Sequence, residues 1–128
     1  MVKLLNPGTM HKPIGYSHVA EVTGKRIVFI AGQVALDSNG NLVGKDNYAS
    51  QTRQAFENLR AAVTTAGGNM KNLIKLNYYC LDLSHLPEIR TVRDEYLDKY
   101  HPPVSTAIEV RRLFRQDILI EIEAVAEI

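Results

Sequence analysis

Three short segments of this sequence combine side-chain types that can move protons or bind a small polar molecule. The first is Gly15-Tyr16-Ser17-His18, a polar and aromatic cluster, and the second is Ala31-Gly32-Gln33. The third is the pair of stretches Pro103–Val110 and Ile120–Ala124, and in the second stretch Glu121 and Glu123 alternate with isoleucines. Because side chains alternate between the two faces of a strand, the face with the glutamates must be at least partly polar. It is either a solvated sheet surface or the wall of a cleft in which a carboxylate handles protons or orders water.

Other kinds of site find no support in the sequence. It contains no P-loop, no dinucleotide-binding glycine pattern, no CxxC and no HExxH. The histidines lack ligand spacing with acidic residues, so surface or capping roles are expected for them and no metal site is predicted; they are His11, His18, His85 and His101. Cys80 falls in the middle of an expected strand, where a buried and inert thiol is the better interpretation.

Composition indicates one soluble domain spanning residues 1–128. The 128 residues are 45% hydrophobic, which excludes a disordered chain. No apolar run reaches the length of a membrane span, and the N-terminal residues lack the apolar region expected of a signal peptide. A single cysteine rules out an internal disulfide, so a cytoplasmic protein is expected. The net charge of +1, from 15 basic and 14 acidic residues, provides no general field for nucleic acid.

The elements that must position these segments centre on Asp46–Leu81. A helix is predicted there because apolar and small residues recur at i, i+3, i+4 and i+7; they are Thr52, Ala55, Phe56, Leu59, Ala62, Val63 and Ala66, with Gln51 among the residues expected to face away. Asp46 or Asn47 can cap its start, and Gly67-Gly68 can end it. From Ile74 to Cys80 the period changes to 2, which indicates a strand with one buried face.

The remaining elements complete the order ββ-α-β-α-ββ. Met1–Ile14 is expected to be an irregular arm with a short strand at Val2–Leu5. A hairpin is predicted from Ser17–Val22 and Arg26–Ile30, which flank Thr23-Gly24-Lys25. A second helix is expected over Leu86–Tyr100, followed by strands at Thr106–Val110 and Ile118–Val125. Gly32 inside a strand pattern predicts a bulge or a close backbone approach.

Two helices can cover only one face of such a sheet. The other face would carry Tyr79, Leu81, Leu119 and Val125 among polar residues. Because that face is too apolar for solvent, we expect it to contact another subunit.

Taken together, blocks along nearly the whole chain resemble the reactive intermediate deaminase family, called Rid or YjgF. The blocks occur in the order of the family's own motifs; they are Gly15-Tyr16-Ser17, Ala31-Gly32-Gln33, Gln51–Leu59, Ala66-Gly67-Gly68, Lys75, Asp82-Leu83, Pro103, Ile108-Glu109-Val110, Arg112-Leu113 and Ile120–Ala126. The resemblance implies a chorismate-mutase-like α+β fold, with a mixed β-sheet and two helices on one face. It also implies a homotrimer with a small-molecule ligand bound in each cleft between subunits. Family enzymes hydrolyse enamines and imines such as 2-aminoacrylate to 2-keto acids and ammonia, without metal or cofactor.

The resemblance also assigns site residues. Glu121 takes the family's glutamate position, Tyr16 its tyrosine position and Gly32 its strand glycine, with Gln33 completing the Gly-Gln dipeptide whose backbone shapes the pocket. Ser105 stands where the family carries an arginine that binds the substrate carboxylate, and Thr106 is expected beside it.

The replacement at Ser105 changes what the site can bind. Arginine offers a carboxylate two parallel charged donors, whereas serine offers one neutral donor. A charged hydrogen bond contributes about 1.5–3 kcal/mol, so the loss weakens carboxylate binding by about ten- to a hundredfold. We hypothesise that Arg90 of the second helix replaces this charge, with Arg93 one turn further on; the alternative is that both are solvated.

Three functions follow from the sequence. The first is a hydrolytic deaminase with an altered substrate, of the 2-iminobutanoate/2-iminopropanoate type. The second is a trimer that binds a metabolite without turnover. The third, a translation-inhibiting endoribonuclease, is disfavoured because phosphate binding needs clustered cations and the only dense run is Arg111–Arg115.

Overall fold

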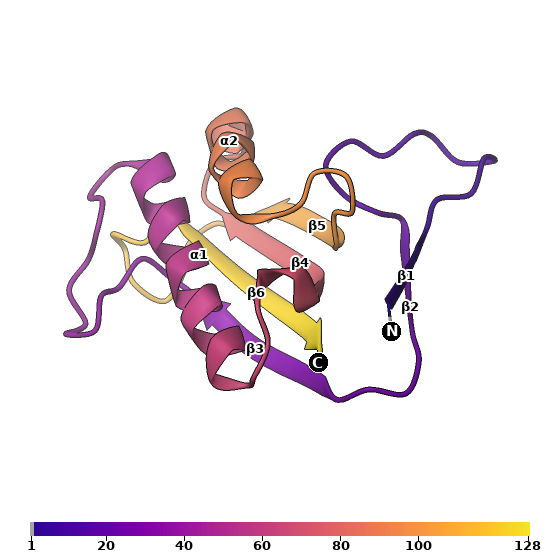
Figure 1. Cartoon of the computed structure of the whole chain (residues 1–128). Helices are drawn as coiled ribbons and strands as arrows, with labels where there is room; N and C mark the ends of the chain where they lie inside the picture. Colours follow the sequence, from indigo (N-terminus) through magenta and orange to yellow (C-terminus); the bar gives the residue numbers. More distant parts are fainter. Residues whose placement is uncertain (1) are drawn as a thin grey trace.

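The chain folds into a mixed four-stranded sheet with two helices on one face, beside a separate two-stranded ribbon near the N-terminus (Figure 1). The computed structural model describes residues 2–128, so Met1 of the expected arm lies outside the described residues. In chain order the elements are β1 (Val2–Leu5), β2 (Val19–Val22), β3 (Ile27–Gln33), α1 (Tyr48–Thr65), the short 3-10 helix Met70–Asn72, β4 (Leu73–Cys80), the short 3-10 helix Leu83–His85, α2 (Leu86–Tyr96), β5 (Val104–Glu109) and β6 (Ile120–Glu127).

The four-stranded sheet has the order β3-β6-β4-β5. The β3–β6 and β4–β6 pairs are antiparallel, whereas β4 and β5 are parallel and are joined through α2. A parallel pair needs such a crossover, which carries α2 onto the same face as α1. The predicted α+β fold with a mixed sheet and two helices is therefore confirmed.

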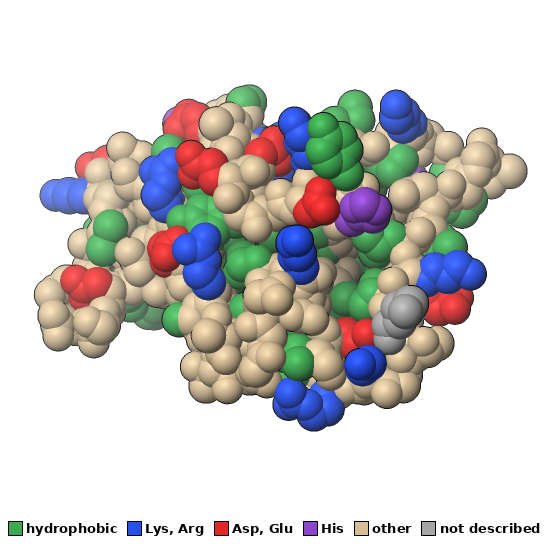
Figure 2. All heavy atoms as spheres, viewed as in Figure 1, with side chains coloured by type: hydrophobic (Ala, Val, Ile, Leu, Met, Phe, Trp, Pro, Cys, Tyr) green, Lys and Arg blue, Asp and Glu red, His purple; other side chains and the backbone are tan. Residues whose placement is uncertain are grey.

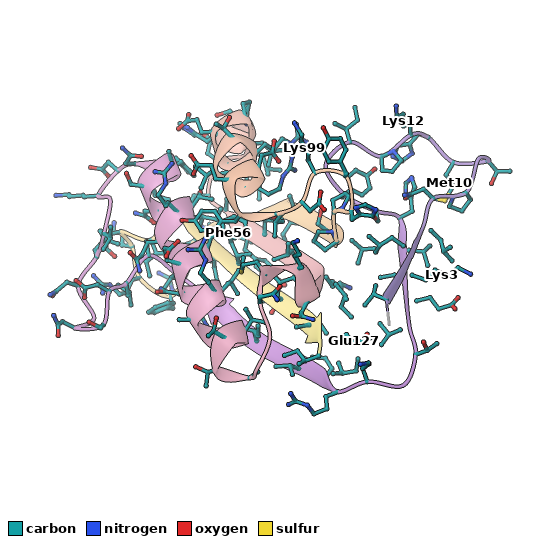
Figure 3. All side chains as sticks on the ribbon, viewed as in Figure 1. Lys3, Met10, Lys12, Phe56, Lys99 and Glu127 are labelled. Atoms are coloured by element: carbon teal, nitrogen blue, oxygen red, sulfur yellow. The ribbon has the colours of Figure 1, made fainter. Side chains whose placement is uncertain are left out.

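Helix α1 begins and ends at the capping residues that its sequence predicts. The Asn47 side chain accepts a hydrogen bond from the Ser50 backbone N–H at 2.9 Å, and Gly67 adopts a φ of 95° just beyond the last turn. Phe56 leaves α1 on the side of the sheet and α2 (Figure 3), and its ring stacks on Tyr96 at a centroid distance of 5.1 Å. Met10 and Lys12 lie far from this core, out on the N-terminal arm (Figure 3).

The prediction that Gln51 faces away from the core was wrong. Its side chain is fully buried and bridges three backbone groups of distant segments. It accepts a hydrogen bond from the Leu119 N–H at 2.9 Å and donates to the carbonyls of Asp117 and Gly44 at 3.0 and 3.2 Å. Gln51 therefore connects α1 to the segment that precedes β6.

The predicted hairpin was also wrong. Strands β2 and β3 are consecutive, but β2 pairs with β1 and β3 pairs with β6. The chain between them does not fold back on itself, because Arg26 exchanges backbone hydrogen bonds with Ile128 instead. The short strand predicted at Val2–Leu5 is confirmed as β1.

Helix α2 is shorter than predicted. It ends at Tyr96, because Leu97 is extended and the Asp98 side chain accepts a hydrogen bond from the Tyr100 N–H. In the sheet, alternation places Leu76, Tyr78 and Cys80 of β4 in the core, under the helices. Their neighbours in the strand point to the opposite, uncovered face. The expected irregularity at Gly32 is present as a register shift between Ile30 and Gln33.

Candidate ligand-binding site

A cavity of about 150 Å³ lies between α2, the β4–β5 edge of the sheet and the N-terminal arm. Its wall combines apolar side chains with hydroxyl and guanidinium groups; the lining residues are Ile14, Tyr16, Tyr78, Leu86, Ile89, Arg90, Arg93, Ser105 and Ala107. A concave site in which polar groups converge between apolar walls is typical of small-molecule binding. We call it the helix-side cavity.

Tyr16 is positioned by the arm's attachment to β5. Ser17 forms a parallel bridge with Val104, its N–H donates to the Pro103 carbonyl at 3.1 Å, and its hydroxyl donates to the Pro102 carbonyl. Ser17 is almost fully buried there. These bonds fix the arm along the outer edge of β5, so that Tyr16 comes to lie beside Ser105.

Two histidines of the arm surround the Tyr16 ring. The Tyr16 hydroxyl hydrogen-bonds His11 Nε2 at 2.6 Å, and His18 Nε2 bonds the His11 carbonyl oxygen at 2.8 Å. The His18 ring meets both neighbours edge-on, with centroid distances of 4.7 Å to His11 and 5.5 Å to Tyr16. The tyrosine hydroxyl therefore has a partner that can exchange a proton with it.

Ser105 enters the cavity because of its register in β5. It pairs with Leu76 of β4, whose side chain is buried under the helices, so the Ser105 side chain takes the same side of the sheet. Arg90 and Arg93 approach from α2, one turn apart. Arg90 is exposed, whereas the Arg93 side chain is only 14% exposed.

Tyr78 forms part of the cavity wall and was not singled out as a site residue from the sequence. It is 5% exposed, and among the described residues its hydroxyl oxygen has no hydrogen-bond partner. Burial raises the pKa of this hydroxyl above its ordinary value, while the positive charge of Arg93 acts in the opposite direction. A signal was present in the sequence: a tyrosine in a core-facing alternation needs a partner for its hydroxyl.

A second polar cluster lies on the uncovered face of the sheet. The Glu123 carboxylate accepts hydrogen bonds from the Tyr79 hydroxyl at 2.6 Å and from Asn77 at 2.9 Å. Beside it, a hollow of about 460 Å³ is lined by residues of β3, β4 and β6; they are Phe29, Ile30, Ala31, Lys75, Asn77, Glu123, Ala124 and Val125. Phe29 is 80% exposed there, and Ile108 of β5 is also exposed. An apolar surface of this kind is typical of a protein contact.

Glu121 lies on this same face, next to Gly32. A Cβ on Gly32 would come within 2.7 Å of the Glu121 carboxyl group, so only glycine allows the carboxyl to lie against the β3 backbone. Burial, and then the neighbouring Glu123 carboxylate, raise the pKa of Glu121. The hydrogen bonds from Tyr79 and Asn77 lower the pKa of Glu123. Two adjacent carboxylates with pKa values pushed apart are suited to different roles in proton transfer.

The structure thus divides the predicted site residues between two faces. Tyr16, Ser105 and Arg90 meet in the helix-side cavity. Glu121 and Gly32 meet on the uncovered face. The remaining two join neither pair directly: Thr106 pairs with Asn77 on the uncovered side of β5, and the Gln33 amide donates to the Ala31 carbonyl at 3.0 Å.

No group of three or more His, Cys, Asp or Glu side chains within residues 2–128 is placed to hold a metal ion. None of the described helices is long and apolar enough to cross a membrane. On the face seen in Figure 2, basic and acidic side chains are intermixed. Cys80 is a fully buried free thiol, and burial raises its pKa.

Comparison with known proteins gives a consistent family match. Residues 9–128 match the family model described as Endoribonuclease L-PSP. A RutC family protein from Pyrococcus horikoshii is 37% identical over 116 residues, covering 90% of this chain and 89% of the relative. A 3-aminoacrylate deaminase from Acinetobacter baylyi is 30% identical, covering 87% and 86%. A 2-iminobutanoate/2-iminopropanoate deaminase from Salmonella typhimurium is 29% identical, covering 78% of each chain.

Solved structures agree with this match. A Rid-family protein of unknown function from Yersinia pestis superposes with a TM-score of 0.89 at 32% identity, covering 99% of this chain and 98% of that one. The E. coli protein TdcF, solved with bound serine, superposes with a TM-score of 0.73 at 26% identity, covering 96% and 93%. The fold described above is thus shared with solved Rid-family structures, and the TdcF neighbour was solved with bound serine.

Proposed function

Because the chain belongs to the Rid (YjgF) family of L-PSP domains, we propose that it binds a small metabolite and hydrolyses a reactive enamine or imine to a 2-keto acid and ammonia. Two of its relatives are named as deaminases of such compounds. The serine in the E. coli neighbour is a small amino acid, of a size that suits the helix-side cavity. A cytoplasmic location belongs to the same proposal and agrees with the free Cys80 thiol.

The proposed reaction needs one group to activate water and one to donate a proton. Water adds to the carbon of the C=N bond, the nitrogen takes up protons, and ammonia leaves as the carbonyl forms. Glu121, with its raised pKa, suits the carboxylate that exchanges protons with water. Tyr16, hydrogen-bonded to His11, suits the group that orients or protonates the substrate nitrogen.

Bringing these groups together requires more than one chain, and we propose a homotrimer of chorismate-mutase-like subunits for this purpose. Within one chain, the sheet separates Glu121 from the cavity that contains Tyr16 and Ser105. The exposed Phe29 and Ile108 on the uncovered face favour contact with a second copy. In the proposed assembly, Glu121, Gly32 and Gln33 of one subunit face Tyr16 and Ser105 of its neighbour.

The altered substrate is proposed from the chemistry of Ser105. A hydroxyl at this position supplies one neutral donor in place of the family's guanidinium. Arg90 lines the same cavity and is exposed at its mouth, which suits contact with the outer part of a substrate. The proposed enzyme therefore prefers a substrate other than 2-aminoacrylate.

The observation that carries this proposal is the meeting of Tyr16 and Ser105 in one cavity that is also lined by Arg90 and Arg93 of α2. The experiment generates imines in situ from a panel of amino acids with an amino-acid oxidase. Decay of each imine is followed as loss of its semicarbazone adduct, with and without the protein. Faster decay of at least one imine, lost in the Tyr16→Phe variant, is the expected result; no acceleration with any imine refutes turnover.

One observation favours binding without turnover as the second candidate. No carboxylate is among the residues that line the helix-side cavity of a chain. If the neighbouring subunit supplies none either, a bound metabolite meets no general base. Tight binding of a 2-keto acid without acceleration of any imine would favour this regulatory function.

A further inference from the structure

The helix-side cavity contains two polar groups that neither the sequence motifs nor the relatives' names assign. One is the Tyr78 hydroxyl, which is buried in the cavity wall without a hydrogen-bond partner in the described chain. The other is the Arg93 guanidinium, which lies on α2 in the same wall. Leaving a buried hydroxyl unpaired costs stability, so a site that retains one is suited to a ligand that completes the hydrogen bond.

Arg93 is held in place on two sides. Its Nε donates a hydrogen bond to Oδ1 of Asp94 at 3.0 Å, and its Nη2 forms an ion pair with the same oxygen at 2.9 Å. On the other side, the arm passes so closely that a Cβ on Gly15 would overlap Nη2 and lie 2.7 Å from Nη1. The φ of Gly15 is 76°, which glycine adopts without strain. The motif Gly15-Tyr16 therefore brings the arm directly against this guanidinium.

Asp94 does not use all the donors of Arg93. Both contacts go to the same carboxylate oxygen, and they involve Nε and Nη2 but not Nη1. A guanidinium has five N–H donors in a fixed plane, so part of the fork stays available to a second anion. The Arg93 side chain is 14% exposed, compared with an exposed Arg90. A charge in such a partly buried place is screened less by solvent and binds an anion more strongly.

Building on the proposed function, we propose that Arg93 and Tyr78 bind the carboxylate of a short 2-imino or 2-oxo monocarboxylic acid, with Ser105 as the third donor. The guanidinium that the family places on the strand is thus supplied by α2. The cavity of about 150 Å³ is smaller than a typical drug-sized pocket, and Ile14, Ile89 and Ala107 give it apolar walls. These walls suit a short aliphatic chain and leave no second cation deep in the cavity for a second carboxylate.

The test measures binding by calorimetry on the full-length protein in the assembly it forms. The probes are 2-oxobutanoate and its neutral amide, 2-oxobutanamide. The wild-type protein is expected to bind the acid and to discriminate against the amide. Arg93→Gln is expected to weaken acid binding by about ten- to a hundredfold and to abolish the discrimination, since a charged hydrogen bond is lost.

Matched variants separate this assignment from a loss of folding. Lys25→Gln removes an exposed cation that does not line the cavity, and it is expected to change acid affinity by less than about threefold. Arg90→Gln removes the other cation of the cavity wall and is expected to leave the discrimination between acid and amide in place. Tyr78→Phe removes only the hydroxyl and is expected to weaken acid binding by a few-fold while leaving the melting temperature unchanged or raised. The acid-to-amide ratio is insensitive to the fraction of folded protein, so Arg93→Gln is informative even if it lowers stability.

Two results would overturn the assignment: equal binding of acid and amide by the wild-type protein, or discrimination that survives Arg93→Gln and is lost in Arg90→Gln. Acid binding that depends on Arg93, without acceleration of any imine, would support the carboxylate site while refuting the deaminase. The two proposals therefore fail on different measurements.

Discussion

The two faces of the sheet carry opposite chemistry. The helix-side cavity gathers Arg90, Arg93 and hydroxyl groups around a small hollow, and no acidic side chain is among its lining residues. The uncovered face gathers Glu121 and Glu123 between exposed apolar side chains. An anionic substrate suits the first face, and proton transfer suits the second. Under the proposed function, a single chain has the two halves of the site on opposite faces of its sheet, and a neighbouring subunit is needed to join them.

The largest effect is expected when the proposed second subunit is removed from the uncovered face. Phe29→Lys places a charge on the 80% exposed Phe29 side chain, at the centre of the proposed contact. Burying an unpaired charge costs several kcal/mol, so dissociation and a loss of imine hydrolysis of about 10³-fold are expected. Sedimentation velocity and the imine-decay assay measure the two effects.

Carboxylate binding provides the contrast within that experiment. It is expected to remain within a few-fold of wild type in Phe29→Lys, because the helix-side cavity belongs to one chain. Thr64→Lys adds the same charge to the exposed side of α1 and serves as the control. A dissociated Phe29→Lys protein with full activity would contradict the division of labour.

The next largest effect on imine hydrolysis is expected from removing the Glu121 carboxyl group alone. Glu121→Gln keeps the shape of the side chain but cannot exchange a proton, and general acid–base groups contribute about 10²–10⁴-fold. We expect kcat to fall by about 10²-fold or more while binding of 2-oxobutanoate changes little. The assay compares this variant with Glu21→Gln, an exposed glutamate of β2. Unchanged kcat in Glu121→Gln would remove Glu121 from the mechanism.

Moving the Glu121 carboxyl group without removing it tests whether its position matters for catalysis. Gly32→Ala introduces a Cβ within 2.7 Å of the Glu121 carboxyl group, so the carboxyl must shift. We expect kcat to fall by about tenfold and stability by about 1–3 kcal/mol, as for other overpacked sites. Gly8→Ala is the matched control, because nothing lies within 4 Å of a Cβ there. Wild-type kcat in Gly32→Ala would show that the Glu121 position is not critical.

The smallest expected effect is the pH dependence of stability. The pKa of Glu121 is raised, so its contribution to stability is present at acid pH and is lost as pH rises through the folded-state pKa. The pKa of Glu123 is lowered, so its contribution is present above the unfolded-state pKa and is lost as pH falls through the folded-state pKa.

Melting temperatures between pH 3 and pH 7 therefore separate the two carboxylates. Relative to wild type, Glu121→Gln should gain stability as pH rises, whereas Glu123→Gln should be destabilised near neutral pH and approach wild type in acid. Because both groups are partly exposed, shifts of at most a few degrees are expected. Parallel curves for the two variants would show that their environments do not differ.

Much of the fold could be predicted from the sequence because its strongest signals are local. The apolar stripe of α1 and the alternation in β4 each depend on neighbours within a few residues. The bulge at Gly32 could be predicted for the same reason. The pairing of β2 with β1 could not, because Thr23-Gly24-Lys25 resembles a turn, whereas partner choice is decided by distant segments such as Ile128.

The site was predicted in part, and the misses share one cause. Tyr16, Ser105 and Arg90 could be placed in one cavity from motif positions and helix spacing. Tyr78 was counted only as core, because alternation reports burial but not whether a hydroxyl finds a partner. Arg93 is partly buried because the N-terminal arm passes against it at Gly15. Gln51 is buried because its side chain hydrogen-bonds the Asp117 carbonyl, 66 residues later in the chain. Contacts between segments far apart in the chain produce no periodic pattern in the sequence, so they could not be predicted from it.

The attachment of the arm at Ser17 has a practical consequence. The outer wall of the cavity is the N-terminal arm, which we call the strap. It is attached to β5 by the bridge between Ser17 and Val104 and by the adjoining hydrogen bond from Ser17 to Pro103. A ligand that fills the cavity rests against this strap, so occupancy should slow its cutting by a protease that needs locally unfolded chain. Nicking rates near Lys12 would then report on ligand screens without any knowledge of the reaction.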